Sequence, residues 1–199
     1  MMLLNPHAIL FDMDGVLVDS LDSWWYAMNS ALKTYNQKEI SREEFIKKYW
    51  GHDLRDNLKT MNLDPEIGTF CNTIYSAHLN AIKIYPDTQK TLQTLHHYTK
   101  GIITNTPREC TKKILKQFAI NQYFQVIVTS DEVSYAKPHP EIIIKACQLL
   151  NVDPTTVLTI GDTESDVKAG RSAGCTVIGL NIDADIRIQR LSQILDLVA

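Results

Sequence analysis

The chain has 199 residues, of which 44% are hydrophobic and 22% are charged. This balance is typical of a soluble globular protein, and the length suits one compact core with a small second lobe. It excludes a disordered chain, a collagen-like repeat and a disulfide-stapled scaffold. The 20 basic and 23 acidic residues give a net charge of −3, so no overall positive field favours nucleic acid or an anionic membrane as a partner.

The longest apolar runs, such as residues 8–11, are strand-sized and far too short to span a membrane. The N-terminus lacks the basic region of a secretory signal and reaches Asn5, Pro6 and His7 almost at once. The four cysteines are scattered, without the paired spacing of a zinc site or a redox pair. We therefore predict free thiols and a cytoplasmic location.

Short apolar segments predict strands, in chain order at residues 8–11, 101–104, 124–128, 157–160 and 176–180. Segments of this length and composition are typical of strands buried on both faces of a parallel sheet. Helical periodicity after residue 87 predicts helices at residues 88–97, 108–118, 141–150 and 188–197. The alternation predicts an α/β fold, with a Rossmann-like, mostly parallel sheet covered by helices on both faces.

Residues 19–86 interrupt this alternation, because only helical periodicity is visible there. Ser41 and Glu44 have the spacing of a capping box, which marks the start of one helix. Apolar spacing predicts helices on either side of it, at residues 21–32, 54–61 and 67–82.

The interruption comes directly after the first strand, so the simplest organisation is an inserted domain. We predict a helical cap of residues 16–85 within a core of residues 1–15 and 86–199. Linkers near residues 16–20 and 83–87 would join the two.

Ligands of an open parallel sheet bind beyond the carboxyl ends of the strands. Asp12 and Asp14 follow the first predicted strand and share one side of an extended backbone, because alternate side chains do. Two such charges are costly unless a cation or a proton separates them, and a hard dication such as Mg²⁺ fits carboxylate oxygens. The residues that later strands and loops deliver to the same edge are Thr104, Asn105, Lys137, Asp162 and Asp166.

Each of these signals alone also has an ordinary structural explanation. An aspartate pair before glycine favours a turn, and Thr104 could satisfy backbone groups at a strand end. A single lysine such as Lys137 is usually solvated, and Asp162 could be the N-cap of a helix. Their order along the chain and their shared strand-end position favour one site instead.

The segments Asp12-Met13-Asp14-Gly15, Thr104, Lys137 and Gly161-Asp162 with Asp166 resemble, in order, the four motifs of the haloacid dehalogenase-like hydrolase superfamily. The match spans the predicted sheet domain, and the inserted helices resemble the small α-helical cap of that superfamily. The resemblance implies a phosphoryl-transfer enzyme that uses Mg²⁺.

The resemblance also implies a role for each motif residue. Asp12 would be the nucleophile that forms an aspartyl-phosphate, and Asp14 the general acid and base. Thr104 and Lys137 would hold the phosphoryl group. The metal-binding residues that it implies are Asp12, Asp14 through its backbone carbonyl, Asp162 and, in a supporting role, Asp166.

The branch of the superfamily follows from smaller features. Asp14 excludes the dehalogenase-like members, which lack an aspartate there. Mutase-like members usually carry a histidine shortly after the first motif, where residues 21–26 contain none. Asp19-Ser20 and Lys137-Pro138 resemble phosphoglycolate phosphatase-like and pyrophosphatase-like members.

We therefore predict a phosphatase that hydrolyses a small phosphorylated metabolite, phosphoglycolate-like in character. A β-phosphoglucomutase-like phosphomutase, a pyrophosphatase and a non-catalytic binding protein on the same scaffold stay open as alternatives. The predicted partner is a small-molecule phosphate ester, with no nucleic acid or membrane, and the chain is predicted to be a monomer or homodimer.

Substrate choice is expected to depend on the cap. Trp50-Gly51-His52 is predicted to be a turn that faces the pocket, and Arg55 lies one helical turn beyond. Arg55 could bind a carboxylate or a second phosphate, or it could pair at the surface with Asp56 or Glu66. The predicted substrate-binding residues are Asn105, Gly51, His52 and Arg55.

Overall fold

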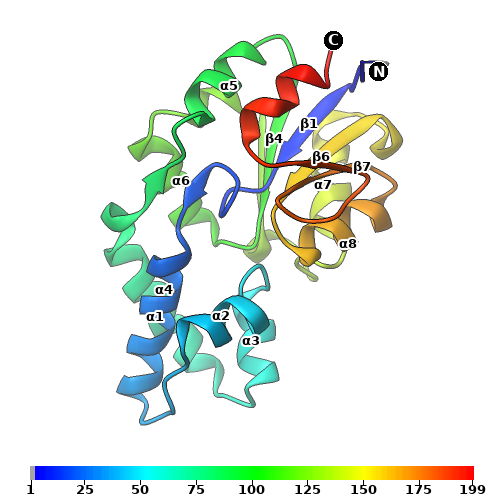
Figure 1. Cartoon of the computed structure of the whole chain (residues 1–199). Helices are drawn as coiled ribbons and strands as arrows, with labels where there is room; N and C mark the ends of the chain where they lie inside the picture. Colours follow the sequence, from blue (N-terminus) through cyan, green and yellow to red (C-terminus); the bar gives the residue numbers. More distant parts are fainter. Residues whose placement is uncertain (1–2) are drawn as a thin grey trace.

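The computed structural model describes residues 3–199, and within this range six strands form one parallel sheet in the order β5-β4-β1-β6-β7-β8 (Figure 1). β1 lies between β4 and β6, so Phe11 is opposite Ile102 on one side and Ile160 on the other. The strands are β1 (Ala8–Phe11), β4 (Lys100–Thr104), β5 (Val126–Thr129), β6 (Val157–Gly161), β7 (Thr176–Leu180) and β8 (Ile186–Ile188). The predicted α/β fold is confirmed.

Helices cover both faces of this sheet. Ala8 and Leu10 of β1 belong to one buried apolar cluster, and Ile9 and Phe11 to another, because alternate side chains of a strand point to opposite faces. α7 and α8 pack against each other on the Ala8 side, whereas α5 and α6 contribute to the cluster on the Phe11 side. These helices are α5 (Thr88–Thr94), α6 (Arg108–Gln117), α7 (Glu141–Leu150) and α8 (Glu164–Ala173).

Between β1 and α5 the chain leaves the sheet domain and forms a helical insertion (residues 16–85), seen below it in Figure 1. Two short strands, β2 (Val18–Asp19) and β3 (Lys83–Ile84), pair antiparallel where the chain enters and leaves. The prediction of no strand in residues 19–86 was therefore wrong, because strands of two residues are too short to give a periodic pattern. The helices are α1 (Leu21–Thr34), α2 (Arg42–Lys48), α3 (Leu54–Thr60) and α4 (Pro65–Ala77).

Short polar side chains start the later helices of the insertion. The side chains of Ser41, Asp53 and Asp64 accept backbone N–H groups at the first turns of α2, α3 and α4. Of the two hydrogen bonds of the capping box predicted at α2, only the one accepted by the Ser41 side chain forms. Ser41 accepts from the Glu44 N–H at 3.1 Å, but the Glu44 carboxylate accepts from Lys48 Nζ at 2.8 Å instead of turning back to the cap.

The C-terminal segment differs from its prediction. Residues 188–197 do not form an α-helix; the edge strand β8 is followed by a 3₁₀ helix, η5 (Leu191–Asp196). Leu191 and Ile194 are both buried there, and their spacing of three suits a 3₁₀ turn as well as an α-helix. α5 also ends at Thr94, before the predicted residue 97.

Two bulk predictions can be compared with the structure directly. The four cysteines are all buried free thiols, as predicted. Within residues 3–199, every helix is too short or too polar to cross a membrane.

Candidate active site

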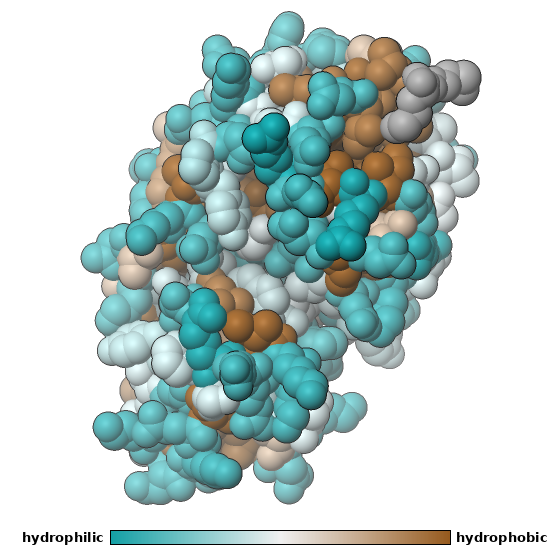
Figure 2. Space-filling view, viewed as in Figure 1, coloured by the Kyte–Doolittle hydropathy of each residue, from teal (hydrophilic) through white to brown (hydrophobic). Residues whose placement is uncertain are grey.

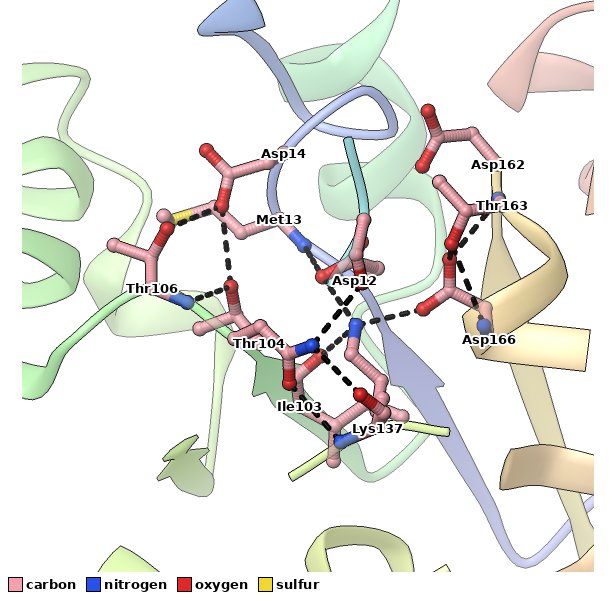
Figure 3. Close-up of polar contacts among 12 residues, drawn as sticks. Asp12, Met13, Asp14, Ile103, Thr104, Thr106, Lys137, Asp162, Thr163 and Asp166 are labelled. Carbon is pink, nitrogen blue, oxygen red and sulfur yellow. Dashed lines mark hydrogen bonds and ion pairs between the residues drawn. The ribbon is translucent and has the colours of Figure 1, made fainter. Parts of the chain in front are cut away.

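Three adjacent strands carry the predicted site residues to one edge of the sheet. Asp12 follows β1, Asp162 follows β6, and Thr104 is the last residue of β4. Because these strands are parallel neighbours, their carboxyl ends meet. The motif side chains that the structure gathers there are Asp12, Asp14, Thr104, Lys137, Asp162 and Asp166 (Figure 3).

Lys137 is a buried cation at the centre of this edge, with 2% of its surface exposed. Its Nζ lies 2.8 Å from Oδ1 of Asp12 and 2.6 Å from Oδ1 of Asp166. It also donates to the carbonyl oxygen of Ile103 at 3.1 Å. Burial lowers the pKa of Lys137, but the two facing carboxylates outweigh this and raise that pKa above its ordinary value. Lys137 is therefore a fixed positive charge beside Asp12.

Asp12 is a buried carboxylate of the edge, with 4% of its surface exposed. Besides its ion pair with Lys137, Oδ1 accepts the backbone N–H of Met13 at 2.8 Å. Burial raises the pKa of Asp12 well above its ordinary value, and the neighbouring carboxylates add to a rise that Lys137 opposes. A further cation would lower this pKa and favour the ionised form that a nucleophile needs.

The carboxylates of Asp12, Asp162 and Asp166 fit a divalent metal ion. One oxygen of each lies within 4.8 Å of the others. In the described part of the chain, Oδ1 of Asp162 is buried without a hydrogen-bond partner, and burial raises the pKa of Asp162 to about 7. A hard dication would satisfy this oxygen and separate the like charges. The carboxylate of Asp14 lies outside the cluster, so a metal role for Asp14 rests on its predicted backbone carbonyl.

Gly15 allows the loop after β1 to pass next to Asp162. Its φ angle is +80°, and a Cβ at this position would lie 2.1 Å from Oδ2 of Asp162. The backbone conformation and the lack of space both exclude a side chain. The glycine of the first motif is thus required by the approach of two loops.

The carboxylate of Asp14 is surrounded by hydroxyl groups. Oδ2 accepts from Thr106 at 2.7 Å and from Thr104 at 3.1 Å. Oδ1 accepts from Ser20 and, at 3.5 Å, from Tyr75. The hydroxyl group of Thr104 therefore donates its hydrogen bond to Asp14 in this structure. The predicted contact of Thr104 with a phosphoryl group stays a prediction.

Asn105 fastens three parts of the site together. Its Nδ2 donates to the carbonyl oxygens of Gly51 and Lys137, both at 3.1 Å, and its Oδ1 accepts the N–H of Lys137 at 3.1 Å. Both amide hydrogens are thus used by backbone groups. Asn105 lines the site, and these bonds hold the Lys137 loop and the insertion in place. Its predicted contact with a substrate stays a prediction.

Side chains of the sheet edge and of the helical insertion enclose a cavity of about 50 Å³. Gly51 and His52 line it from the insertion, as expected of the predicted turn. The residues that line it from the sheet domain are Asp12, Asp14, Thr104, Asn105, Thr106 and Lys137.

Arg55 lies outside this cavity. Its Nε is 2.9 Å from Oδ1 of Asp53, and its Nη2 donates to the carbonyl oxygen of Ser130 at 3.0 Å. It lines a neighbouring hollow of about 670 Å³ between the insertion and the sheet domain. Arg55 therefore does not line this cavity, and its ion-pair partner is Asp53 rather than the predicted Asp56 or Glu66. Its predicted binding of a carboxylate or a second phosphate stays a prediction.

Comparison with known families gives a match over residues 9–180 to the family described as haloacid dehalogenase-like hydrolase. The chain belongs to this family. The resemblance inferred from the motifs is confirmed.

Relatives within the family carry more than one name. Pyrophosphatase PpaX of Anoxybacillus flavithermus is 29% identical over 211 residues, covering 98% of each chain. A crystal structure of a predicted phosphoglycolate phosphatase from Haemophilus somnus is 28% identical with a TM-score of 0.81, covering 96% of each chain. A putative phosphoglycolate phosphatase from Lactobacillus plantarum has a TM-score of 0.89 at 22% identity, covering 98% of this chain and 100% of its own, and so shows the fold alone.

Motif reasoning missed several residues that this haloacid dehalogenase-like hydrolase brings to its site. Thr106 lies two residues after Thr104, in the bend that follows β4, and both hydroxyl groups donate to Oδ2 of Asp14. Its closeness in sequence to Thr104 is the signal that could have found it. Ser20 and Tyr75 reach Asp14 from the insertion, and nothing in their local sequence indicates this. Trp50 of the insertion donates its indole N–H to Oδ2 of Asp162 at 3.2 Å, a contact that only the tertiary structure reveals.

Proposed function

We propose that this protein is a Mg²⁺-dependent phosphatase that hydrolyses a small phosphate monoester through an aspartyl-phosphate on Asp12. The observation that carries the proposal is the pairing of Asp12 with the buried cation Lys137, beside a carboxylate oxygen of Asp162 that has no hydrogen-bond partner among residues 3–199. A nucleophile, a fixed positive charge and a metal-binding oxygen are the parts that phosphoryl transfer requires.

The first half of the reaction transfers the phosphoryl group to the protein. A carboxylate oxygen of Asp12 bonds to phosphorus while the bond from phosphorus to the ester oxygen breaks. Asp14 gives its proton to the departing oxygen, which leaves as an alcohol. Lys137, held next to Asp12, offsets the negative charge that gathers as the carboxylate meets the phosphate.

The second half releases phosphate. Asp14, now ionised, takes a proton from a water molecule, whose oxygen bonds to phosphorus as the bond to Asp12 breaks. The hydroxyl groups of Thr104 and Thr106 hold the Asp14 carboxylate in position between the two proton transfers. Each half-reaction restores what the other consumed, so only water and substrate are used.

The metal would be held by Asp12, Asp162 and the backbone carbonyl of Asp14, with Asp166 in support. When bound, Mg²⁺ supplies charge neutralisation to the phosphoryl oxygens and to the carboxylates around it. Asp166 is placed in support of the metal because its two carboxylate oxygens already bind Lys137 and Thr163.

The helical insertion would act as a cap over this site. Its contacts with the sheet domain support the proposal: Asn105 donates to the Gly51 carbonyl, and Lys113 Nζ donates to Ser76 Oγ at 3.0 Å. Within the described chain, the backbone enters the insertion through β2 and leaves it through β3, and these two strands pair with each other. Residues 16–85 are therefore proposed as the cap domain.

Phosphoglycolate and pyrophosphate are the first substrates to test, since they correspond to the names of relatives at 28–29% identity. Phosphate release from a panel of small phosphate esters and pyrophosphate, with and without EDTA, would measure the activity. We expect turnover that needs Mg²⁺ and is lost in Asp12→Asn. Turnover that persists in Asp12→Asn would contradict the proposed nucleophile, and no turnover across the panel would favour the mutase or binding alternatives.

A further inference from the structure

The wall that the helical insertion presents to the cavity is aromatic and apolar. Its large side chains are Trp24, Met28, Phe45, Tyr49, Trp50 and Leu54. Among residues 3–199, no lysine, arginine, aspartate or glutamate of the insertion lines this cavity. Figure 2 shows apolar surface at the waist between the insertion and the sheet domain, with hydrophilic side chains around it.

Packing holds this wall in place. Trp24 stacks on the fully buried ring of Tyr75, with centroids 3.7 Å apart and planes 14° apart. Phe45 and Trp50 have centroids 6.3 Å apart, and the indole N–H of Trp50 is bound to Asp162. Rings fixed on their far side leave a preformed apolar surface for a ligand.

Two polar side chains beside the wall already have partners. Asn57 donates its side-chain amide to the Tyr49 carbonyl at 3.0 Å. The Arg55 guanidinium binds Asp53 and the Ser130 carbonyl and faces the neighbouring hollow. His52 is exposed at the cavity margin. A negatively charged group that entered next to the wall would lose its water without gaining a lysine or arginine of the insertion as a partner.

The charges of the sheet edge also disfavour a second negative charge on the substrate. The ammonium of Lys137 lies between the carboxylates of Asp12 and Asp166, and Asp162 adds a third carboxylate to the same cluster. The proposed metal would serve the transferred phosphoryl group. A second anion on the substrate would therefore meet an unfavourable field as well as an apolar surface.

We propose that the substrate of this site is a phosphate monoester of an uncharged alcohol or phenol whose leaving group has an apolar or planar face. The inference rests on the proposed phosphatase function and narrows it. Substrates with a second negative charge, such as phosphoglycolate, pyrophosphate and bisphosphates, are poor substrates under this proposal.

A matched pair of substrates tests the charge of the leaving group. Phenyl phosphate and 4-carboxyphenyl phosphate differ by one carboxylate, and the carboxylate makes the phenol a slightly better leaving group. In the absence of binding effects, 4-carboxyphenyl phosphate should therefore be hydrolysed slightly faster than phenyl phosphate. We expect kcat/KM for phenyl phosphate to be larger by at least about tenfold, which corresponds to about 1.4 kcal/mol. Equal values, or a preference for 4-carboxyphenyl phosphate, phosphoglycolate or pyrophosphate, would overturn the proposal.

A new cation in the wall provides the second test. Leu54→Lys is expected to raise kcat/KM for 4-carboxyphenyl phosphate several-fold relative to phenyl phosphate. Ile46→Lys is the matched control, because Ile46 is 42% exposed on α2 and does not line the cavity; it should leave the ratio unchanged. If circular dichroism shows that Leu54→Lys is unfolded, His52→Lys brings the same charge to the margin. If a folded variant leaves the ratio of the two kcat/KM values unchanged, the apolar wall is not the cause of the discrimination against charged leaving groups.

Acetyl phosphate separates failure of this inference from failure of the phosphatase proposal. It is an activated phosphoryl donor that needs little recognition of its leaving group. If Asp12-dependent phosphate release occurs from acetyl phosphate but the two phenyl substrates are equal, the phosphatase proposal stands and the narrowed substrate class is wrong. If acetyl phosphate and the phenyl substrates all fail, both proposals fall.

Discussion

The indole nitrogen of Trp50, in the helical insertion, donates a hydrogen bond of 3.2 Å to Oδ2 of Asp162, at the end of β6. The other oxygen of Asp162 is the buried one that lacks a partner within residues 3–199. One carboxylate thus has one oxygen held by the insertion and the other free for a metal ion. The hydrogen bond also lowers the pKa of Asp162 against the rise caused by burial.

Trp50→Phe should weaken Mg²⁺ binding while keeping an aromatic ring in the wall. Loss of the indole donor makes ionised Asp162 less favourable. We therefore expect a rise of about threefold to tenfold in the Kd for Mg²⁺, which corresponds to the net free energy of about one hydrogen bond. Isothermal titration with Mg²⁺ measures this without turnover. Trp25→Phe is the control, because the Trp25 indole donates to the Ile40 carbonyl within the insertion. An equal effect of both variants would contradict the role given to Trp50.

Asp12→Asn should abolish turnover without destabilising the metal-free protein. Turnover should fall by at least about 10³-fold, because the amide cannot form the acyl-phosphate. The raised pKa of Asp12 shows that its negative charge is unfavourable in the fold, so the free energy of unfolding in EDTA should be equal or higher in the variant. Urea unfolding and phosphate release measure the two effects, and a large loss of stability would contradict this account.

The stability of the metal-free protein should fall as pH rises towards 7. Burial raises the pKa of Asp162 to about 7, whereas an unfolded aspartate titrates near 4. Between these values the folded state binds more protons than the unfolded state, so stability decreases with pH. The melting temperature in EDTA should be lower at pH 8 than at pH 5.5, and Mg²⁺ should raise it more at pH 8. Asp162→Asn should reduce the difference in melting temperature between pH 5.5 and pH 8. If that difference is unchanged, the pH dependence of stability comes from other groups.

Gly15→Ala should disrupt the site more than its backbone conformation alone explains. A Cβ at residue 15 would lie 2.1 Å from Asp162, whereas at Gly174, with a φ of +86°, the nearest atom is 3.8 Å away. Gly174→Ala therefore reports the strain of a left-handed alanine, about 1–2 kcal/mol. We expect Gly15→Ala to lose more stability than this and to bind Mg²⁺ poorly. Equal melting temperatures in the two variants would contradict a clash with Asp162.

Local patterns in the sequence were enough to predict the α/β fold and five of the six strands of the sheet described in residues 3–199, β8 being missed. The strands around Asp12, Thr104 and Asp162 are continuous apolar runs that end in polar residues, and such a signal needs only near neighbours along the chain. The same patterns do not distinguish a 3₁₀ turn from an α-helix at Leu191–Asp196, because burial every three residues suits both.

The contacts that complete the site depend on tertiary structure. Lys137 is buried only because the β5–β4–β1 order carries its loop onto Asp12, and a lone lysine in a sequence indicates a solvated charge. Arg55 is drawn away from the cavity by Asp53, two residues before it, and by the distant Ser130 carbonyl. The contacts of Lys137 with Asp12 and of Arg55 with Ser130 join residues far apart in the chain, whereas the Arg55–Asp53 pair is local. The sequence therefore determined which chemical groups the site contains, and the packing of the insertion on the sheet domain decided which of them face the substrate.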